Sequence, residues 1–245
     1  MKMKEGFESK PQGGFRSMLG LVTNHTLKHT LRWGGMLILI QAIIFLYLGM
    51  EQEISSLPLH LWVDDMFVKY SFIGVLIITS GICANGVYAN ENARYTVQRL
   101  GVSRRKIFAA WMANGICTVL IIWGIQLACL MLCSGYYIWI ADGAGITSQT
   151  ILLSSYRSEF FHMILPIQDI SLWIRNLSFI LFLGASVAYH GMKKLQGINS
   201  MAFVGCIFMI LLNFNLESGM ADYYSAPLLF ICTLGLMKGG VSHEI

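Results

Sequence analysis

Six apolar stretches separated by polar segments make up most of the chain. Each is near the length of about 20 residues that a helix needs to cross a hydrocarbon core of ~30 Å. Backbone polar groups in lipid must be paired within their own segment, so these stretches are predicted to be helices. The predicted spans cover residues 33–50, 67–90, 108–134, 172–190, 200–216 and 223–238, the last two being short. We therefore expect an all-α integral membrane protein with one transmembrane domain over residues 1–245.

Two further segments flank these spans. In residues 15–32, apolar positions recur at helical spacing with polar and basic residues between them. This pattern is typical of an amphipathic helix at the membrane surface. An alternative is that residues 24–32 extend the first span. Residues 135–171 form the predicted outer loop, and its stretch 150–167 is apolar enough to lie at the interface or to re-enter the membrane shallowly.

Composition supports the membrane assignment. The residues AVILMFWYC make up 56% of the chain and charged residues only 12%, about half the usual share in soluble domains. The mean hydropathy is +0.61. These values exclude a disordered chain, a collagen-like repeat and a small disulfide scaffold. All six cysteines lie within apolar stretches, which makes packing their expected role.

The charges are distributed asymmetrically between the loops. With the N-terminus in the cytoplasm, 14 of the 17 Lys and Arg residues fall on the inner side, and Lys69, Arg157 and Arg175 lie at or beyond the outer edge. Nine of the 13 Asp and Glu residues fall on the outer side. Because short cytoplasmic loops carry an excess of Lys and Arg, this pattern predicts six spans with both termini in the cytoplasm.

The sequence lacks the common catalytic motifs. There is no Gly-Lys dipeptide and hence no phosphate-binding loop of the form G-x-x-x-x-G-K-[ST], so we do not expect ATP to bind this chain by that motif. The motifs His-Glu-x-x-His and G-x-S-x-G are also absent. His25 and His29 supply only two ligands, and the Glu159–His162 pair lacks the second copy that a di-metal site needs. We predict no catalytic residue, no metal site and no enzyme activity.

Polar residues inside the predicted spans are mostly amides. Each amide could form a hydrogen bond to a neighbouring helix, which stabilises the pair by about 1 kcal/mol, or it could line a polar path. The hydrogen bond between helices is the commoner role. No Asp or Glu lies at the centre of a span, which disfavours an ion-coupled carrier. Lys69 and Arg175 can extend to the outer headgroups, and the small residues Gly184 and Ala188 permit close helix approach. The amides are Gln41, Asn85, Asn90, Asn114, Gln126 and Asn213.

The loop 91–107 (ENARYTVQRLGVSRRKI) is the most informative one. It carries five basic residues interleaved with apolar residues, and Ser103 is the predicted N-cap of the third span. Topology alone would explain the charges, but it would not explain the apolar residues between them. A cytoplasmic segment that is both apolar and basic suits docking onto another protein.

Taken in order along the chain, four features resemble the permease subunit of a type-2 ATP-binding-cassette (ABC) transporter. Segment 15–32 is similar to that family's connecting helix. Glu91 with residues 94–103 (RYTVQRLGVS) resembles the coupling segment that contacts the ATPase. Residues 160–176 (FFHMILPIQDISLWIRN) are similar to the outer loop of bacterial members, which contains Pro and Trp. As in that family, six spans end in a short helical hairpin.

This resemblance implies a function and a set of partners. Two permease subunits, identical or paired with a sister subunit, would enclose an export pathway for a hydrophobic or amphipathic substrate in the bacterial cytoplasmic membrane. A separate ATPase subunit would hold ATP and Mg, so we expect no cofactor and no nucleic acid on this chain. The implied ATPase-coupling residues are Glu91, Arg94, Tyr95, Arg99, Leu100, Val102 and Arg104, and the candidate pathway residues are Gln41, Asn85 and Gln126.

Other classes of protein stay open at this point. An ion- or proton-coupled secondary transporter, or a membrane-embedded accessory or sensor protein, would also be rich in apolar helices. An intramembrane enzyme should bring ionisable groups together at membrane depth, and the sequence has none there. A P-loop ATPase partner would distinguish the ABC permease from these alternatives.

Overall fold

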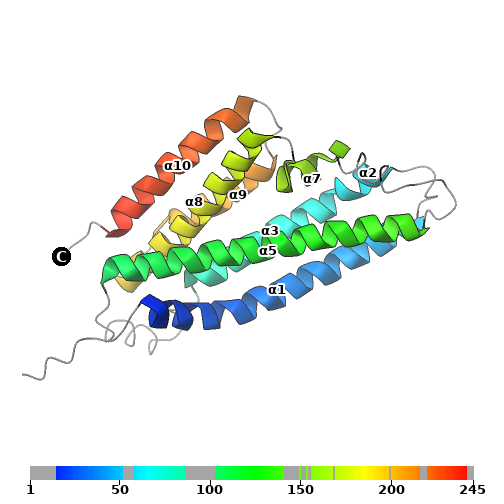
Figure 1. Cartoon of the computed structure of the whole chain (residues 1–245). Helices are drawn as coiled ribbons and strands as arrows, with labels where there is room; N and C mark the ends of the chain where they lie inside the picture. The colour runs from blue at the N-terminus through cyan, green and yellow to red at the C-terminus, as the bar shows by residue number, and fades with distance from the viewer. Residues whose placement is uncertain are drawn as a thin grey trace, which may run out of the picture.

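In the computed structural model every described element is a helix (Figure 1). The structure describes residues 15–51, 58–85, 103–140, 149, 153, 156–167, 169–198, 200–215 and 220–241. The helices are α1 (Phe15–Glu51), α2 (Leu59–Val63), α3 (Met66–Asn85), α5 (Arg104–Ile140), α7 (Glu159–Ile164), α8 (Ile170–Leu195), α9 (Ala202–Asn215) and α10 (Met220–Val241). The helical class predicted from the sequence is confirmed for this part of the chain.

Four segments are long and apolar enough to cross a membrane. They are Val22–Met50 in α1, Leu59–Asn85 in α2 and α3, Arg104–Ile140 in α5, and Ile170–Leu195 in α8. They coincide with the first four predicted spans and are compatible with a multi-pass membrane protein. The apolar helices Ala202–Asn215 and Ser225–Val241, which coincide with the last two predicted spans, are shorter.

The structure joins the segment 15–32 to the first span. The single helix α1 runs without a break from Phe15 to Glu51, so the segment 15–32 and the first predicted span form one helix. Val22, Thr26 and Thr30 are four residues apart and almost fully buried. Oγ1 of Thr26 lies 3.1 Å from the backbone O of Val22, and Thr30 donates to the backbone O of Thr26, so both hydroxyls have an acceptor within the helix. The helix is therefore continuous through residues 24–32, as in the alternative that extends the first span.

The helix that contains the third predicted span is longer than that span. Helix α5 begins at Arg104 and continues past residue 134 to Ile140. Its last turns pack on other helices, with the ring of Tyr137 lying edge-on to Trp62 of α2 at 5.3 Å. Tyr136 lies against Gly49 of α1. Packing on α1 and α2 therefore extends the helix into part of the predicted outer loop.

Helices α5 and α8 approach each other closely at two glycines. A Cβ atom built on Gly115 would lie 3.2 Å from the Cα atom of Gly184, and one built on Gly184 would lie 3.0 Å from the backbone O of Met112. Neither backbone atom can move aside as a side chain would. The prediction that Gly184 permits close approach is confirmed, and Gly115 supplies the matching surface on α5.

An aromatic cluster joins helices that are distant in sequence. The ring of Phe72 in α3 lies 5.3 Å from Phe214 of α9, 5.8 Å from Trp123 of α5 and 6.0 Å from Phe160 of α7, with the rings near perpendicular in the first two pairs. Phe179 of α8 completes the cluster at 5.9 Å from Phe214. Each such pair contributes about 0.5–1.5 kcal/mol beyond its buried area.

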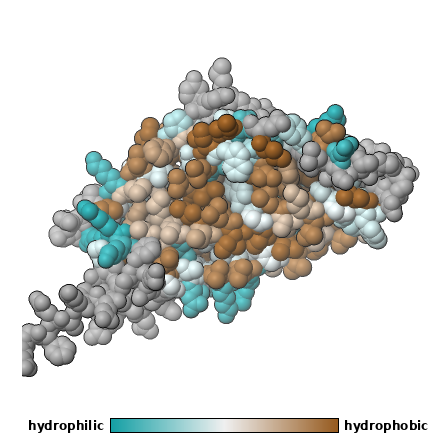
Figure 2. Space-filling model, in the orientation of Figure 1, coloured by the Kyte–Doolittle hydropathy of each residue, from teal (hydrophilic) through white to brown (hydrophobic). Residues whose placement is uncertain are grey.

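Many basic and acidic side chains lie at opposite ends of the bundle. In Figure 1 the start of α5 and the ends of α8 and α10 lie together at the left. These helix termini carry six basic residues, which we call the basic end: Arg104, Arg105, Lys106, Lys193, Lys194 and Lys238. Four acidic side chains lie toward the other end, which we call the acidic end: Asp64, Asp65, Glu159 and Asp169. Between them, apolar surface covers the middle of the face shown in Figure 2.

We expect Gly115→Val to destabilise the fold, because the new side chain would meet the backbone of α8. Overpacking of this kind typically costs about 1–3 kcal/mol. The melting temperature of the purified protein in mild detergent measures the effect. Gly124→Val is the matched control on the same helix, since a Cβ atom there would meet nothing within 4 Å. Equal melting temperatures for the two variants would contradict the close α5–α8 contact.

Candidate functional site

Two glutamines meet in the core between α1, α3 and α5. The Nε2 atom of Gln41 donates to Oε1 of Gln126 at 2.7 Å, to Oγ of Ser71 at 3.2 Å and to the backbone O of Val68 at 3.3 Å. Both glutamines are fully buried. We call Gln41 and Gln126 the glutamine bridge. It links three helices at one level of the bundle.

The glutamine bridge is only half satisfied. Oε1 of Gln41 and Nε2 of Gln126 are buried without a hydrogen-bond partner in the described part of the chain. A buried amide atom without a partner typically costs about 1–3 kcal/mol. The bridge therefore has one unpaired acceptor and one unpaired donor. A different arrangement of the helices, or a polar group between them, would pair both atoms.

A second polar cluster joins the same three helices nearer the basic end. Thr26 of α1 donates to Oδ1 of Asn114 at 2.8 Å, and Nδ2 of Asn114 lies 3.8 Å from Sγ of Cys83. The thiol of Cys83 in turn donates to Oγ1 of Thr118 at 3.2 Å. Sequence reasoning singled out Asn114 but not its Thr and Cys partners, because short hydroxyl and thiol side chains are common in apolar helices.

The three candidate pathway residues do not form one site. Asn85 lies at the end of α3, where its Oδ1 accepts from Nζ of Lys194 at 2.6 Å and its Nδ2 donates to the backbone O of Gly81. Gln41 and Gln126, by contrast, lie together in the core. In this conformation the two glutamines join helices, which is the structural role that the sequence left open. Their role in a pathway stays a prediction.

Most of the predicted coupling residues lie outside the described part of the chain: Glu91, Arg94, Tyr95, Arg99, Leu100 and Val102. Arg104 is described and is the first residue of α5. The backbone O of Ser103 accepts from the backbone N of Lys106 and of Ile107, which places Ser103 at the start of the helix, as predicted. The predicted coupling segment thus leads directly into the N-terminus of α5.

The short helix α7 covers the core toward the acidic end. Its residues Phe160, Phe161, Met163 and Ile164 are buried. Phe160 reaches the ring of Phe72 in α3. This helix lies in the stretch 150–167, which the sequence predicted to be interfacial or re-entrant. After the predicted outer loop, in which it lies, we call α7 the outer cap.

The N-terminus of the outer cap is held by Asp64, which follows α2. Oδ1 of Asp64 accepts from Oγ of Ser158 at 2.7 Å and from the backbone N of Phe160 at 3.0 Å, and its Oδ2 accepts from the backbone N of Glu159 at 3.3 Å. Ser158 Oγ accepts from the backbone N of Phe161. The first N–H groups of a helix lack intrahelical partners, and a carboxylate is the strongest acceptor for them.

Two buried side chains hold the other end of the outer cap. Nε1 of Trp123 in α5 donates to the backbone O of Ile164 at 3.0 Å, and Nδ2 of Asn176 in α8 donates to the backbone O of Met163 at 2.8 Å. Sequence reasoning missed both partners, because each is an isolated polar group in an apolar helix. Ser158 before an apolar run was the one signal that could have located the start of α7.

Three other residues singled out in the sequence take up different surroundings. Arg175, expected to reach the outer headgroups, is only 2% exposed, because it lies on the inward face of α8 with Leu172 and Phe179. Glu159 is exposed, and the ring of His162 lies against Tyr156 at 5.6 Å. Within the described ranges no three His, Cys, Asp or Glu side chains are grouped to hold a metal ion.

Comparison of the chain with protein-family models, curated proteins and solved structures gave no match. The class that the fold defines is a helical bundle with the length and apolarity of a multi-pass membrane protein. Its function must therefore be argued from its own residues.

The glutamine bridge predicts a non-additive pair of substitutions. Gln41→Leu would leave the Gln126 amide buried without a partner, and we expect a loss of about 1–3 kcal/mol in the free energy of unfolding. The double variant Gln41→Leu/Gln126→Leu removes both amides and should recover much of that loss. Denaturant unfolding in detergent measures both. A double variant that loses the sum of the two single losses would contradict the bridge.

The Asp64 contacts predict that Asp64→Ala loosens the outer cap. Loss of a charged hydrogen-bond acceptor should raise the labelling rate of a cysteine at Met163→Cys by about tenfold, corresponding to ~1.4 kcal/mol. A membrane-impermeant maleimide measures this rate in a background where the exposed Cys117 and Cys232 are serine. The matched control is Asp65→Ala, because Asp65 accepts from the backbone N of Phe67. If both alanine variants label alike, Asp64 does not anchor α7.

Proposed function

We propose that the chain is the permease subunit of an ABC transporter and works with a separate ATPase subunit. The observation that carries this proposal is helix α5. It starts directly after the basic segment 91–103 and runs uninterrupted for 37 residues, about 55 Å. Along its length it meets α1 and α8, and its Trp123 holds the outer cap. A force applied to the segment 91–103 would therefore reach the opposite side of the bundle through one rigid helix.

The basic end suits a partner on the cytoplasmic side. Three helix termini bring six Lys and Arg side chains together there, and the acidic side chains of the described ranges lie toward the other end. In this proposal Glu91, Arg94, Tyr95, Arg99, Leu100, Val102 and Arg104 contact the ATPase, which holds ATP and Mg. This chain converts closure of the ATPase into helix movement.

Six spans with both termini in the cytoplasm are part of the proposal. Helices α9 and α10 would cross as a hairpin that packs on α8. Helix α9 has 14 residues, about 21 Å, which is shorter than a ~30 Å core. Local thinning of the bilayer accommodates such a mismatch at a modest cost per ångström.

The route for the substrate would open beside the glutamine bridge. The bridge has an unpaired donor and an unpaired acceptor inside an otherwise apolar core. A substrate that passes through, or a second arrangement of the helices, could form hydrogen bonds with them. The outer cap closes the acidic end above it. In this proposal the route stays closed toward the outside until energy is supplied. Such a route suits an exporter, in which two such subunits in the bacterial cytoplasmic membrane move a hydrophobic or amphipathic substrate outward.

Purification with an ATPase tests the proposal directly. The chain, isolated from its native membrane in mild detergent, should carry a P-loop ATPase that photolabels with azido-ATP and turns over ATP in the complex. Arg99→Asp/Leu100→Asp should reduce the bound ATPase and its turnover at least tenfold, because it reverses charge in the coupling segment and removes an apolar contact.

The matched control makes the same two substitution types at the acidic end, Leu153→Asp/Arg157→Asp, where both side chains are exposed. This control should keep the ATPase bound. An unchanged complex after the Arg99 and Leu100 substitutions would overturn the docking assignment. Transport driven by an ion gradient without any ATPase would instead favour a secondary carrier.

A further inference from the structure

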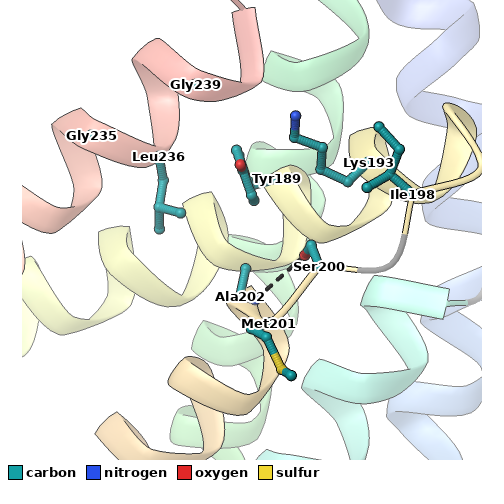
Figure 3. A pocket seen from close by; sticks show the side chains of 9 residues that line it. All are labelled: Tyr189, Lys193, Ile198, Ser200, Met201, Ala202, Gly235, Leu236 and Gly239. Atoms are coloured by element: carbon teal, nitrogen blue, oxygen red, sulfur yellow. Dashed lines mark hydrogen bonds between the residues drawn. The ribbon is translucent and has the colours of Figure 1, made fainter.

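A cavity of about 510 Å³ lies between the basic ends of α8, α9 and α10 (Figure 3). Its polar lining is Tyr189 and Lys193 of α8 and Ser200 of the turn before α9. Its apolar lining includes Ile198, Met201 and Leu236. A volume in the range of about 300–1,000 Å³ with a few convergent polar groups is typical of a small-ligand site.

The polar groups of the cavity lie close together. Tyr189 and Lys193 are four residues apart, on one face of α8, and Nζ of Lys193 is 5.6 Å from the centroid of the Tyr189 ring. Ser200 is held by its neighbours, since its Oγ lies 3.2 Å from Nδ1 of His190 and accepts from the backbone N of Ala202. One cation and hydroxyl groups therefore line the same cavity.

The electrostatic surroundings favour an anion. Lys194 next to Lys193 contacts the neutral amide of Asn85, and Lys238 adjoins Gly239 at the cavity edge. In the described part of the chain the acidic side chains lie toward the other end of the bundle. The positive charge at this cavity thus has no described carboxylate near it.

The apolar lining identifies the kind of anion. Ile198 and Met201 are 51% and 82% exposed beside the cavity, where the chain turns between α8 and α9. The end of a membrane-spanning helix is the level of lipid headgroups, and exposed apolar side chains there contact acyl chains. A ligand with a phosphate at Lys193 and a hydrocarbon chain along Leu236 and Met201 matches both halves of the lining.

We propose that this cavity binds the headgroup of an anionic phospholipid from the leaflet at the basic end. Basic pockets between membrane helices are suited to such headgroups, and each Lys near the surface makes the free energy of lipid binding more favourable. The bound lipid would sit against α8 and α10 and join their ends. The inference depends on the membrane location of the bundle and not on an ATPase partner.

Native mass spectrometry of the detergent-purified chain, titrated with phosphatidylglycerol, tests the proposal. Lys193→Gln should weaken phosphatidylglycerol binding about fivefold, the effect of one surface lysine. Lys28→Gln removes the same charge from an exposed site on α1, outside the cavity lining, and should leave binding unchanged. Equal binding by native protein and Lys193→Gln, or equal loss in both variants, would overturn the site.

Two further measurements separate lipid from other occupants. Gly235→Leu adds apolar volume at a cavity-lining position where a Cβ atom has open space, so it should block the lipid without removing a charge. Binding of zwitterionic phosphatidylcholine should stay weak in all variants. Displacement of phosphatidylglycerol by millimolar glycerol 3-phosphate would show that the site takes a soluble anion, and unchanged binding in Gly235→Leu would show that the lipid lies elsewhere. Either result contradicts the proposal.

Discussion

The backbone contact between α5 and α8 is the constraint on which the arrangement of the bundle depends. Because Gly115 and Gly184 have no side chains, the two helices touch there. This contact brings Trp123 of α5 and Asn176 of α8 within reach of the same short helix, α7. It also leaves the opposite face of α5 to pack on α1. One close crossing thus decides which side chains can meet in the core.

Much of the fold followed from the sequence because lipid allows few solutions. Apolar runs had to be helices, and Gly184 was expected to permit the close helix approach that the structure shows. The continuity of α1 did not follow, because the polar and basic residues of segment 15–32 were interpreted as one face of a separate helix at the membrane surface, whereas Thr26 and Thr30 are buried in the bundle. Helix α5 is longer than the predicted span 108–134, since its last turns pack on α1 and α2.

The candidate site was predictable only in part. Gln41 and Gln126 stood out as amides in apolar helices, and the structure brings them together. Asn85 looked the same in the sequence but lies with Lys194, because side-chain partners depend on helix crossings that no local pattern contains. The anchors of the outer cap come from three distant segments, so no spacing along the chain connects Asp64, Trp123 and Asn176.

The anchoring of α7 bears on how the proposed transporter would use energy. Asp64, Trp123 and Asn176 make five hydrogen bonds to the segment 158–164, and a typical one contributes about 0.5–1.5 kcal/mol. The docked position of α7 is then favoured by several kcal/mol, before the burial of Phe160 and Ile164 is considered. Reversing a preference from 1:99 to 99:1 takes about 5.5 kcal/mol of differential binding. In the proposed transporter, a partner that binds the open form more tightly would have to offset this preference, and α5 connects the cap to the end of the bundle where the proposal places that partner.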